Sequence, residues 1–300
     1  MNISEEISLS SDIKKELQKA VPLRGVLERE SQERIGFSTA LYIIPIQNGE
    51  IKPNHVSINV EHEDTKVPGL GVAKLFIATY ALQEIDKGIA RKDEKLLSLS
   101  TFVPVTRSET GSSSRTMKVL LQNMIHSSDN DATTDLADFF GRKHIQDYIE
   151  SLGLKKSSIF VPEDGLHATI TPRETALFLS RVWRGDILSK RSQDFLFRSM
   201  QDATMPDVKA EEIFPFETYP QALFYHKPGG EIQKKSGTVY FHDASIVLLP
   251  KEGQDTETAS GGIIVFCSKR KDVTLETQKS TLKKVYSRFL KHSTNTKSKS

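Results

Sequence analysis

Residues 68–82 of this 300-residue chain read PGLGVAKLFIATYAL, a loop with two glycines that leads into an apolar run beginning on a lysine. The run predicts a helix from about Val72 to Gly88, because glycine is favoured just after a helix C-terminus. Gly71 and Lys74 are three positions apart, so they share one face of that helix. A lysine at the buried start of an apolar helix is costly unless it has partners or a chemical role. The stretch therefore predicts a functional site around Gly71 and Lys74.

The overall composition is typical of a globular protein, with 37% hydrophobic and 27% charged residues. The net charge of +2 gives no electrostatic argument for a nucleic acid or an anionic membrane as partner, so we expect neither. The single cysteine, Cys267, excludes a disulfide within this sequence. It lies in the apolar run from Ile263 to Cys267, so we expect a buried structural thiol.

The first residues, Met1 to Glu6, lack the basic and apolar segments of a signal peptide. No apolar run reaches the length of a transmembrane helix. We therefore expect a cytoplasmic protein, or a periplasmic or secreted one if a signal peptide has been replaced by methionine.

Strand patterns occur near both ends of the chain, and helical patterns lie between them. The expected strands are Ile35 to Ile46, Val56 to Val60, Ala222 to Tyr225, Ile232 to Phe241, Ala244 to Leu249 and Gly262 to Ser268. The expected later helices are Met117 to His126, Ala132 to Phe140, Lys143 to Leu152, Thr171 to Gly185, Ser189 to Met200 and Thr274 to about His292. The segment from Ile159 to Ile170 is expected to be a loop.

This order predicts one domain over residues 1–300, of the α/β (α+β) class. Its antiparallel sheet takes strands from both chain ends, about residues 11–88 and 215–292, and is flanked by helices. An all-helical block, about residues 89–214, is inserted between the strands. The polar tail at residues 293–300 is expected to be disordered.

Three short motifs follow one another along the chain: Gly71-Val72-Ala73-Lys74, Ser128-Asp129-Asn130 and Lys235-Ser236-Gly237. Together they resemble the class A β-lactamases and related penicillin-recognising serine hydrolases, whose motifs are Ser-x-x-Lys, Ser-Asp-Asn and Lys-Thr/Ser-Gly. The resemblance extends from about residue 23 to residue 290 and includes the helix that begins at Thr171-Pro172. It implies a β-lactamase/DD-peptidase-like fold with a cleft between the sheet and the helical block.

The resemblance also implies roles for the first two motifs. Lys74 would relay protons to and from the nucleophile, which suits a desolvated lysine with a lowered pKa. Ser128 would pass a proton to the leaving group, and Asn130 would hydrogen-bond a substrate amide carbonyl.

The third motif would bind the substrate's acidic group. Lys235 and Ser236 would attract a carboxylate, and Gly237 would leave room for the substrate beside the edge strand. The backbone N–H groups of Gly71 and Thr238 would form the oxyanion hole, since a glycine keeps its N–H.

The chain departs from the family pattern at the nucleophile, because Gly71 stands where the family has serine. No Ser, Thr or Cys occurs within residues 67–73, and loss of the nucleophile removes most of the rate in enzymes of this kind. Glu163 is the candidate for the family's deacylating glutamate, although the loop from there to Thr171 is short. For the third motif the alternative is His226-Lys227-Pro228-Gly229; we favour Lys235 because Ser236-Gly237-Thr238 matches better.

Three function classes stay open at this point. We favour a pseudoenzyme that binds a small-molecule or peptide-like ligand, a carboxylate-bearing amide or lactam. The alternative is an active hydrolase in which Lys74 activates a water molecule in place of the serine. The third is a structural or interaction domain. His226 and His242 lack metal-binding spacing, so we expect no metal, and no cofactor is indicated. Nothing in the sequence indicates the oligomeric state.

Overall fold

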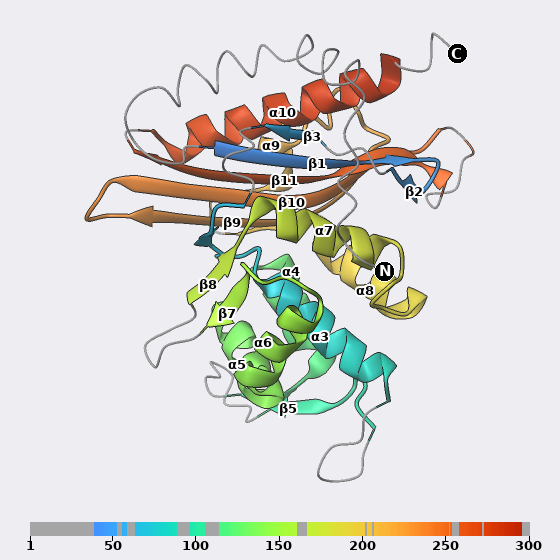
Figure 1. Cartoon of the computed structure of the whole chain (residues 1–300), viewed down its shortest axis with the longest axis vertical. Helices are drawn as coiled ribbons and strands as arrows, with labels where there is room; N and C mark the ends of the chain where they lie inside the picture. Colours follow the sequence, from blue (N-terminus) through green and yellow to red (C-terminus); the bar gives the residue numbers. More distant parts are fainter. Residues whose placement is uncertain are drawn as a thin grey trace.

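A six-stranded antiparallel sheet forms the centre of the computed structural model (Figure 1). The structure describes residues 39–52, 56–58, 64–88, 96–105, 114–160, 167–201, 203–205, 207–251, 253, 258–271 and 273–295. The strands are β1 (Thr39–Gln47), β2 (Glu50–Ile51), β3 (Val56–Ile58), β9 (Leu223–Gln233), β10 (Thr238–Leu249) and β11 (Ser260–Lys271). Their order is β2-β1-β11-β10-β9, with β3 also paired to β1. The prediction that both parts of the chain supply one antiparallel sheet is confirmed.

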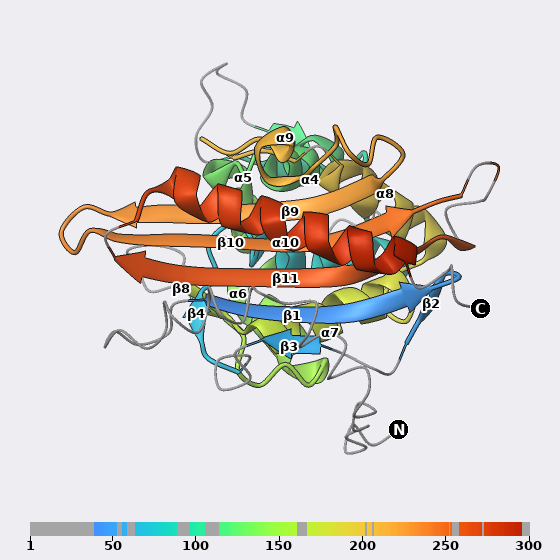
Figure 2. The same ribbon diagram turned by 90° about the horizontal axis from the view of Figure 1, so that it is seen from above.

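Helices cover both faces of this sheet, as the two views show (Figures 1 and 2). On one face lie α9 (Ala210–Ile213) and the long α10 (Leu275–Asn295). Alternation along β1 explains the two layers, since Ala40, Tyr42 and Ile44 join the core on the helical-block side while Leu41 and Ile43 join the core under α10. Both faces are buried, and every residue of β10 is accordingly buried.

The second face carries the helical block, which is built around α3 (Lys74–Asp86). Every α3 residue from Lys74 to Leu82 is buried, as its nearly uninterrupted apolar sequence requires. The remaining helices of the block are α4 (Met117–His126), α5 (Asn130–Phe140), α6 (Arg142–Ser151), α7 (Pro172–Trp183) and α8 (Lys190–Met200). Each of the helices predicted for this region is confirmed.

The block also contains short strands, which the sequence did not predict. One three-stranded sheet has the order β4 (Val67–Pro68), β8 (His167–Ile170) and β7 (Ser158–Phe160), and β5 (Phe102–Pro104) pairs with β6 (Ser114–Thr116). The prediction of a loop from Ile159 to Ile170 is therefore wrong at both of its ends. The strand β8 pairs with β4, immediately before the start of α3, so tertiary pairing overrides the loop-like local sequence.

The predicted strand from Ile232 to Phe241 is also wrong, because the chain turns in its middle. Residues 234–237 form the turn between β9 and β10, and Gly237 has the left-handed φ of +65° that such a turn requires. The strand β9 instead includes Pro228, Gly229 and Gly230, which lie between the predicted strands Ala222 to Tyr225 and Ile232 to Phe241.

Single elements test the remaining predictions. Cys267 is a buried free thiol, as predicted. The helix α10 continues to Asn295, so the first three residues of the expected tail are helical, and residues 296–300 lie outside the described part. Residues before Thr39 and residues 59–63, which include the predicted ends of two strands, are likewise outside it. Within the described residues, none of the helices combines the length and the apolar character needed to cross a bilayer.

The start of α7 gives a stability prediction. The buried Thr171 hydroxyl accepts a hydrogen bond from the Glu174 backbone N–H at 3.1 Å and so caps the helix. Thr171→Ala should lower the free energy of unfolding by about 1–2 kcal/mol, measured by urea denaturation. Thr171→Ser keeps the hydroxyl, so its free energy of unfolding should fall clearly less. Equal decreases in the two variants would show that the cap contributes nothing.

Candidate functional site

The site begins in the loop between β4 and α3, where the chain turns sharply before the helix begins. The Gly69 N–H donates to the carbonyl of Ala168 on β8 at 2.6 Å, which ties this loop to the small sheet. Leu70 has a positive φ of 44°, which is uncommon for a residue with a side chain. Its conformation presents the next residue, Gly71, directly to the strand β9.

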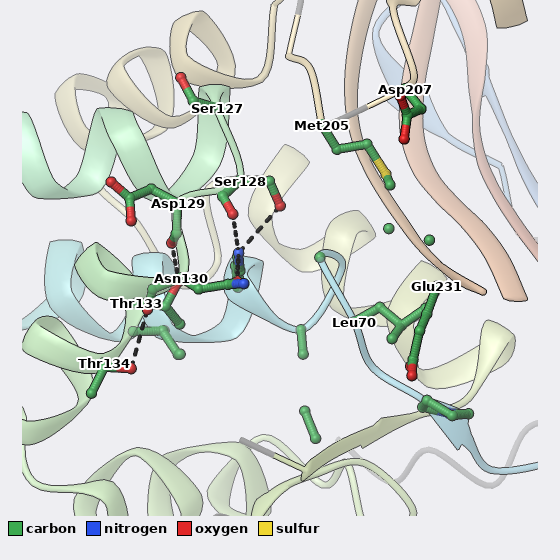
Figure 3. A pocket seen from close by; sticks show the side chains of 18 of the residues that line it. Leu70, Ser127, Ser128, Asp129, Asn130, Thr133, Thr134, Met205, Asp207 and Glu231 are labelled. Atoms are coloured by element: carbon green, nitrogen blue, oxygen red, sulfur yellow. Dashed lines mark hydrogen bonds between the residues drawn. The ribbon is translucent and has the colours of Figure 1, made fainter. Parts of the chain in front are cut away.

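The ammonium group of Lys74, in the first turn of α3, points at the loop between α4 and α5. It donates to the Ser128 carbonyl at 2.5 Å, to the Asn130 Oδ1 at 2.7 Å and to the Ser128 Oγ at 3.2 Å (Figure 3). A lysine ammonium has three protons, so these three acceptors use its whole donor capacity. Ser128 itself has a φ of +56°, and the following Asp129 caps α5 by accepting from the Ala132 N–H at 3.0 Å.

The environment of Lys74 favours the neutral amine more than water does. Burial lowers the pKa of Lys74 from 10.5 to about 8, and the nearby negative charge of Asp129 opposes this effect only in part. The structure thus brings Lys74, Ser128 and Asn130 together, in the arrangement that the sequence motifs predict.

Gly71 makes an unusually close contact with the main chain of β9. A Cβ atom placed on Gly71 would lie 2.2 Å from the carbonyl oxygen of Pro228 and 3.1 Å from the Cα of Gly229. A Cβ atom on Gly229 would in turn lie 2.6 Å from the Gly71 backbone nitrogen. Such separations are far inside van der Waals contact, so only glycine fits at either position without a backbone shift. We call this the Gly71–Gly229 contact.

A second lysine, Lys227, is fully buried on β9 next to this contact. Its ammonium donates to the Pro228 carbonyl at 3.3 Å. Burial lowers the pKa of Lys227 well below its ordinary range, the charge of Lys74 lowers it further, and Asp243 acts in the opposite direction. Lys227 was the alternative third-motif lysine, and its position beside Gly71 favours it over Lys235.

The other third-motif residues lie elsewhere, which corrects the predicted placement. Lys235, Ser236 and Gly237 form the exposed β9–β10 turn, and none of them lines the cleft beside Gly71. The Thr238 N–H, expected in an oxyanion hole, donates to the Ser236 Oγ at 3.3 Å within that turn. The sequence match was misleading because a hairpin turn and the family motif both favour small polar residues and glycine.

Glu163, the candidate deacylating glutamate, lies outside the described residues.

A cleft of about 800 Å³ opens in front of Lys74, between β9 and the helical block (Figure 3). The loop from Ser127 to Asn130 and the α5 residues Thr133 and Thr134 form one side. Gly229 to Ile232 of β9 and the loop residues Met205 and Asp207 form the opposite side. Sequence reasoning missed this second side, because nothing in the pattern marked Met205 or Asp207, and Gly229 and Gly230 lay outside the predicted strands.

The two histidines that were considered for metal binding take structural positions. The His226 Nδ1 contacts the Asp243 Oδ1 at 2.9 Å, and Asp243 also accepts from the hydroxyl of Tyr286. Burial lowers the pKa of His242 to about 4, so this ring is neutral at physiological pH. Among the described residues no group of His, Cys, Asp or Glu side chains has the arrangement of a metal site.

Known proteins resemble this chain in sequence and in fold. The sequence model described as the β-lactamase enzyme family matches residues 34–256. This chain belongs to the β-lactamase enzyme family.

Two relatives are similar to this chain over about three fifths of its length. A β-lactamase of Bacteroides uniformis is 28% identical over 208 residues, which cover 61% of this chain and 67% of the relative. The extended-spectrum β-lactamase PER-1 of Pseudomonas aeruginosa is 27% identical over 202 residues, covering 62% of this chain and 64% of PER-1. The match to PER-1 thus spans less than two thirds of that protein.

A solved structure extends the likeness to nearly the whole fold. A β-lactamase from Chitinophaga pinensis superposes with a TM-score of 0.72 over 92% of this chain and 99% of the other, at 19% identity. At this identity the superposition shows the shared β-lactamase fold.

The Gly71–Gly229 contact predicts that this family member does not tolerate a side chain at position 71. Gly71→Ala should cost about 3 kcal/mol in the free energy of unfolding, because the methyl group collides with the main chain of Pro228. Urea denaturation would measure this. Gly237→Ala is the matched control, since its methyl group enters open space and it meets only the left-handed backbone, at a cost of about 1 kcal/mol. Equal costs would contradict the close contact.

The lowered pKa of Lys74 predicts a pH-dependent stability. Unfolding binds a proton between pH 8 and 10.5, where the amine is neutral in the fold and charged in the unfolded chain, so stability should rise across this window. The gain from Lys74 should be about 2–3 kcal/mol and should be absent below pH 8.

Lys74→Met is the comparison, measured by denaturation at pH 7.5 and pH 10.5. Lys227 also makes the free energy of unfolding rise with pH. The contribution of Lys74 is therefore the difference between the rise in the wild type and the rise in the variant. Between pH 7.5 and pH 10.5 the free energy of unfolding of Lys74→Met should rise clearly less than that of the wild type. Identical rises would show that Lys74 is not desolvated.

Proposed function

We propose that this chain is a pseudoenzyme of the β-lactamase family, which binds an amide or lactam ligand in the cleft without forming an acyl-enzyme. The observation that carries the proposal is the Gly71–Gly229 contact. Position 71 has no hydroxyl, and the main chain of β9 occupies the space that a side chain there would need.

The same contact argues against an oxyanion hole at this position. Two backbone N–H groups must face a space in which a developing negative charge can sit. Here a Cβ atom on Gly229 would lie only 2.6 Å from the Gly71 backbone nitrogen, so the main chain of β9 crowds that nitrogen. Thr238, the first residue of β10, follows the hairpin turn and does not line the cleft, so it supplies no second donor there. Without the nucleophile and the hole, the remaining groups are suited to holding a ligand.

The structure does not support the expectation that the ligand carries a carboxylate. That expectation rested on Lys235 and Ser236, which lie in the exposed turn, and Lys227 is fully buried behind the cleft surface. The proposal therefore keeps the amide or lactam and does not require an acidic group.

A second candidate function rests on Lys74. A lysine with a pKa of about 8, placed 3.2 Å from the Ser128 hydroxyl at the edge of the cleft, has the features of a general base. In this alternative Lys74 activates water for hydrolysis. Against it, all three protons of the charged ammonium already have acceptors.

Intact-protein mass and product analysis separate these possibilities. The wild type should gain no adduct and release no product when it is incubated with a panel of β-lactams and acylated D-alanyl-D-alanine peptides. It should bind at least one of them saturably in titration calorimetry. Gly71→Ser should also stay unmodified, because a serine side chain at 71 cannot adopt its position without displacing β9.

Three results would count against the proposal. Product release that Lys74→Met abolishes would establish the hydrolase alternative. A stable adduct on the wild type would reveal a different nucleophile. Failure to bind any member of the panel would leave no ligand-binding role for the cleft in this substrate class.

A further inference from the structure

Lysine side chains gather at one end of the central sheet. Lys234 and Lys235 lie in the turn between β9 and β10, and Lys269 and Lys271 lie at the end of β11. The strand register brings these two segments side by side, because Lys271 pairs with Thr238, the first residue after the turn. All four lysines are exposed. We call the turn and the end of β11 together the basic sheet end.

The protein does not neutralise the charge of these lysines. Exposed lysines elsewhere often form ion pairs, as Lys143 does with Asp147 at 2.7 Å. Within the described part of the chain, none of the four lysines of the basic sheet end forms an ion pair. Lys269 places its ammonium group 5.9 Å from the centre of the Tyr240 ring, a contact that leaves its charge in place. The four ammonium groups are therefore available to an external anion.

Few negative charges lie in the same segments. Residues 231–238 and 269–272 contain five basic side chains and two acidic ones, Glu231 and Asp272. The net charge of +2 for the whole chain conceals this local excess of positive charge, because acidic residues elsewhere offset it. Composition alone therefore gave no reason to expect an anionic partner.

An exposed apolar side chain accompanies the lysines. Ile232 lies two positions before Lys234 and is 56% exposed. Successive strand residues point to opposite faces, so Ile232 points away from the face of β9 that carries Glu231 and the cleft. Contact of a large apolar side chain with water is unfavourable, so Ile232 gains from a partner that covers it.

The basic sheet end also projects from the molecule. Both ribbon views show the turn between β9 and β10 reaching beyond the helices that cover the two faces of the sheet (Figures 1 and 2). A flat surface that approaches this end therefore meets the turn before it meets any of the described helices. Lys234, Lys235 and Ile232 all lie in or next to that turn.

We propose that the basic sheet end docks on an anionic lipid bilayer. Negative headgroups attract lysines near the surface, and each lysine contributes roughly a fivefold gain in binding. Ile232 enters the boundary between headgroups and acyl chains, where apolar side chains of peripheral proteins are buried. A nucleic acid or a purely acidic peptide matches only the lysines, so the exposed Ile232 favours the bilayer. This docking is independent of the ligand that the cleft binds.

Vesicle sedimentation tests the docking with the whole chain. Vesicles of phosphatidylcholine alone are compared with vesicles of equal parts phosphatidylcholine and phosphatidylglycerol. The protein should sediment with the anionic vesicles at about 0.1 M salt and stay in solution with the neutral ones. Salt at about 1 M should release it, because the screening length falls from roughly 10 Å to roughly 3 Å. No binding to the anionic vesicles, or equal binding to both kinds, would overturn the proposal.

Paired lysine variants locate the contact. Lys234→Gln/Lys235→Gln should weaken binding to the anionic vesicles about 25-fold, at roughly fivefold for each lysine. Lys118→Gln/Lys155→Gln removes the same charge from exposed positions on the helical block and should bind as the wild type does. Equal weakening in the two variants would overturn the assignment of the contact to the basic sheet end.

Ile232→Trp reports whether the apolar side chain enters the bilayer. Trp183 is the only native tryptophan and packs against Phe197 in the helical block, so a change in fluorescence on binding reports position 232. The emission should move to shorter wavelength, and lipids brominated on their acyl chains should quench it. Binding without quenching, together with equally tight binding to soluble polyglutamate, would overturn the bilayer as partner and favour an acidic macromolecule.

Discussion

The close approach of two main-chain segments is the constraint on which this molecule depends. Gly71 at the start of α3 and Pro228–Gly229 on β9 are packed so tightly that neither glycine could carry a Cβ. The helix α3 is the centre of the helical block, and β9 is the edge strand of the sheet. The contact therefore fixes the distance between the two halves of the domain at the point where the cleft is formed. In this setting the packing itself requires glycine at position 71.

This arrangement also decides how the buried charges are held. Two lysines lie near each other at the closed end of the cleft, which is costly for both. The Ser128–Asn130 loop offsets the cost of burying the Lys74 ammonium group. Ser128 has a left-handed backbone conformation, and both its carbonyl and its hydroxyl accept hydrogen bonds from that ammonium group. Lys227 has a backbone carbonyl as its hydrogen-bond acceptor, and burial favours its neutral form.

Much of the fold could be predicted from local sequence signals. The apolar run after Lys74, the Thr171-Pro172 start and the alternation in residues 56–58 each specify one element, and the structure confirms them. The motif Ser128-Asp129-Asn130 likewise placed its side chains correctly opposite Lys74. What local patterns could not supply was the course of β9. Pro228, Gly229 and Gly230 are poor strand residues, and they are in the strand because small residues are needed where α3 and Met205 approach the backbone. The same misreading placed the third motif in the turn at Lys235 instead of at Lys227.

The most direct measurement of the central claim is the proximity of Gly71 and Gly229 in solution. In a protein labelled with ¹⁵N,¹³C-glycine, a strong nuclear Overhauser effect should connect the Gly71 amide proton with the α protons of Gly229. The signal should persist when a ligand is bound, because the contact belongs to the closed end of the cleft. A Gly71 amide that instead shows a cross-peak to water and none to Gly229 would mean that the oxyanion-hole position is open. That result would contradict the closed arrangement and return the chain to the candidates for catalysis.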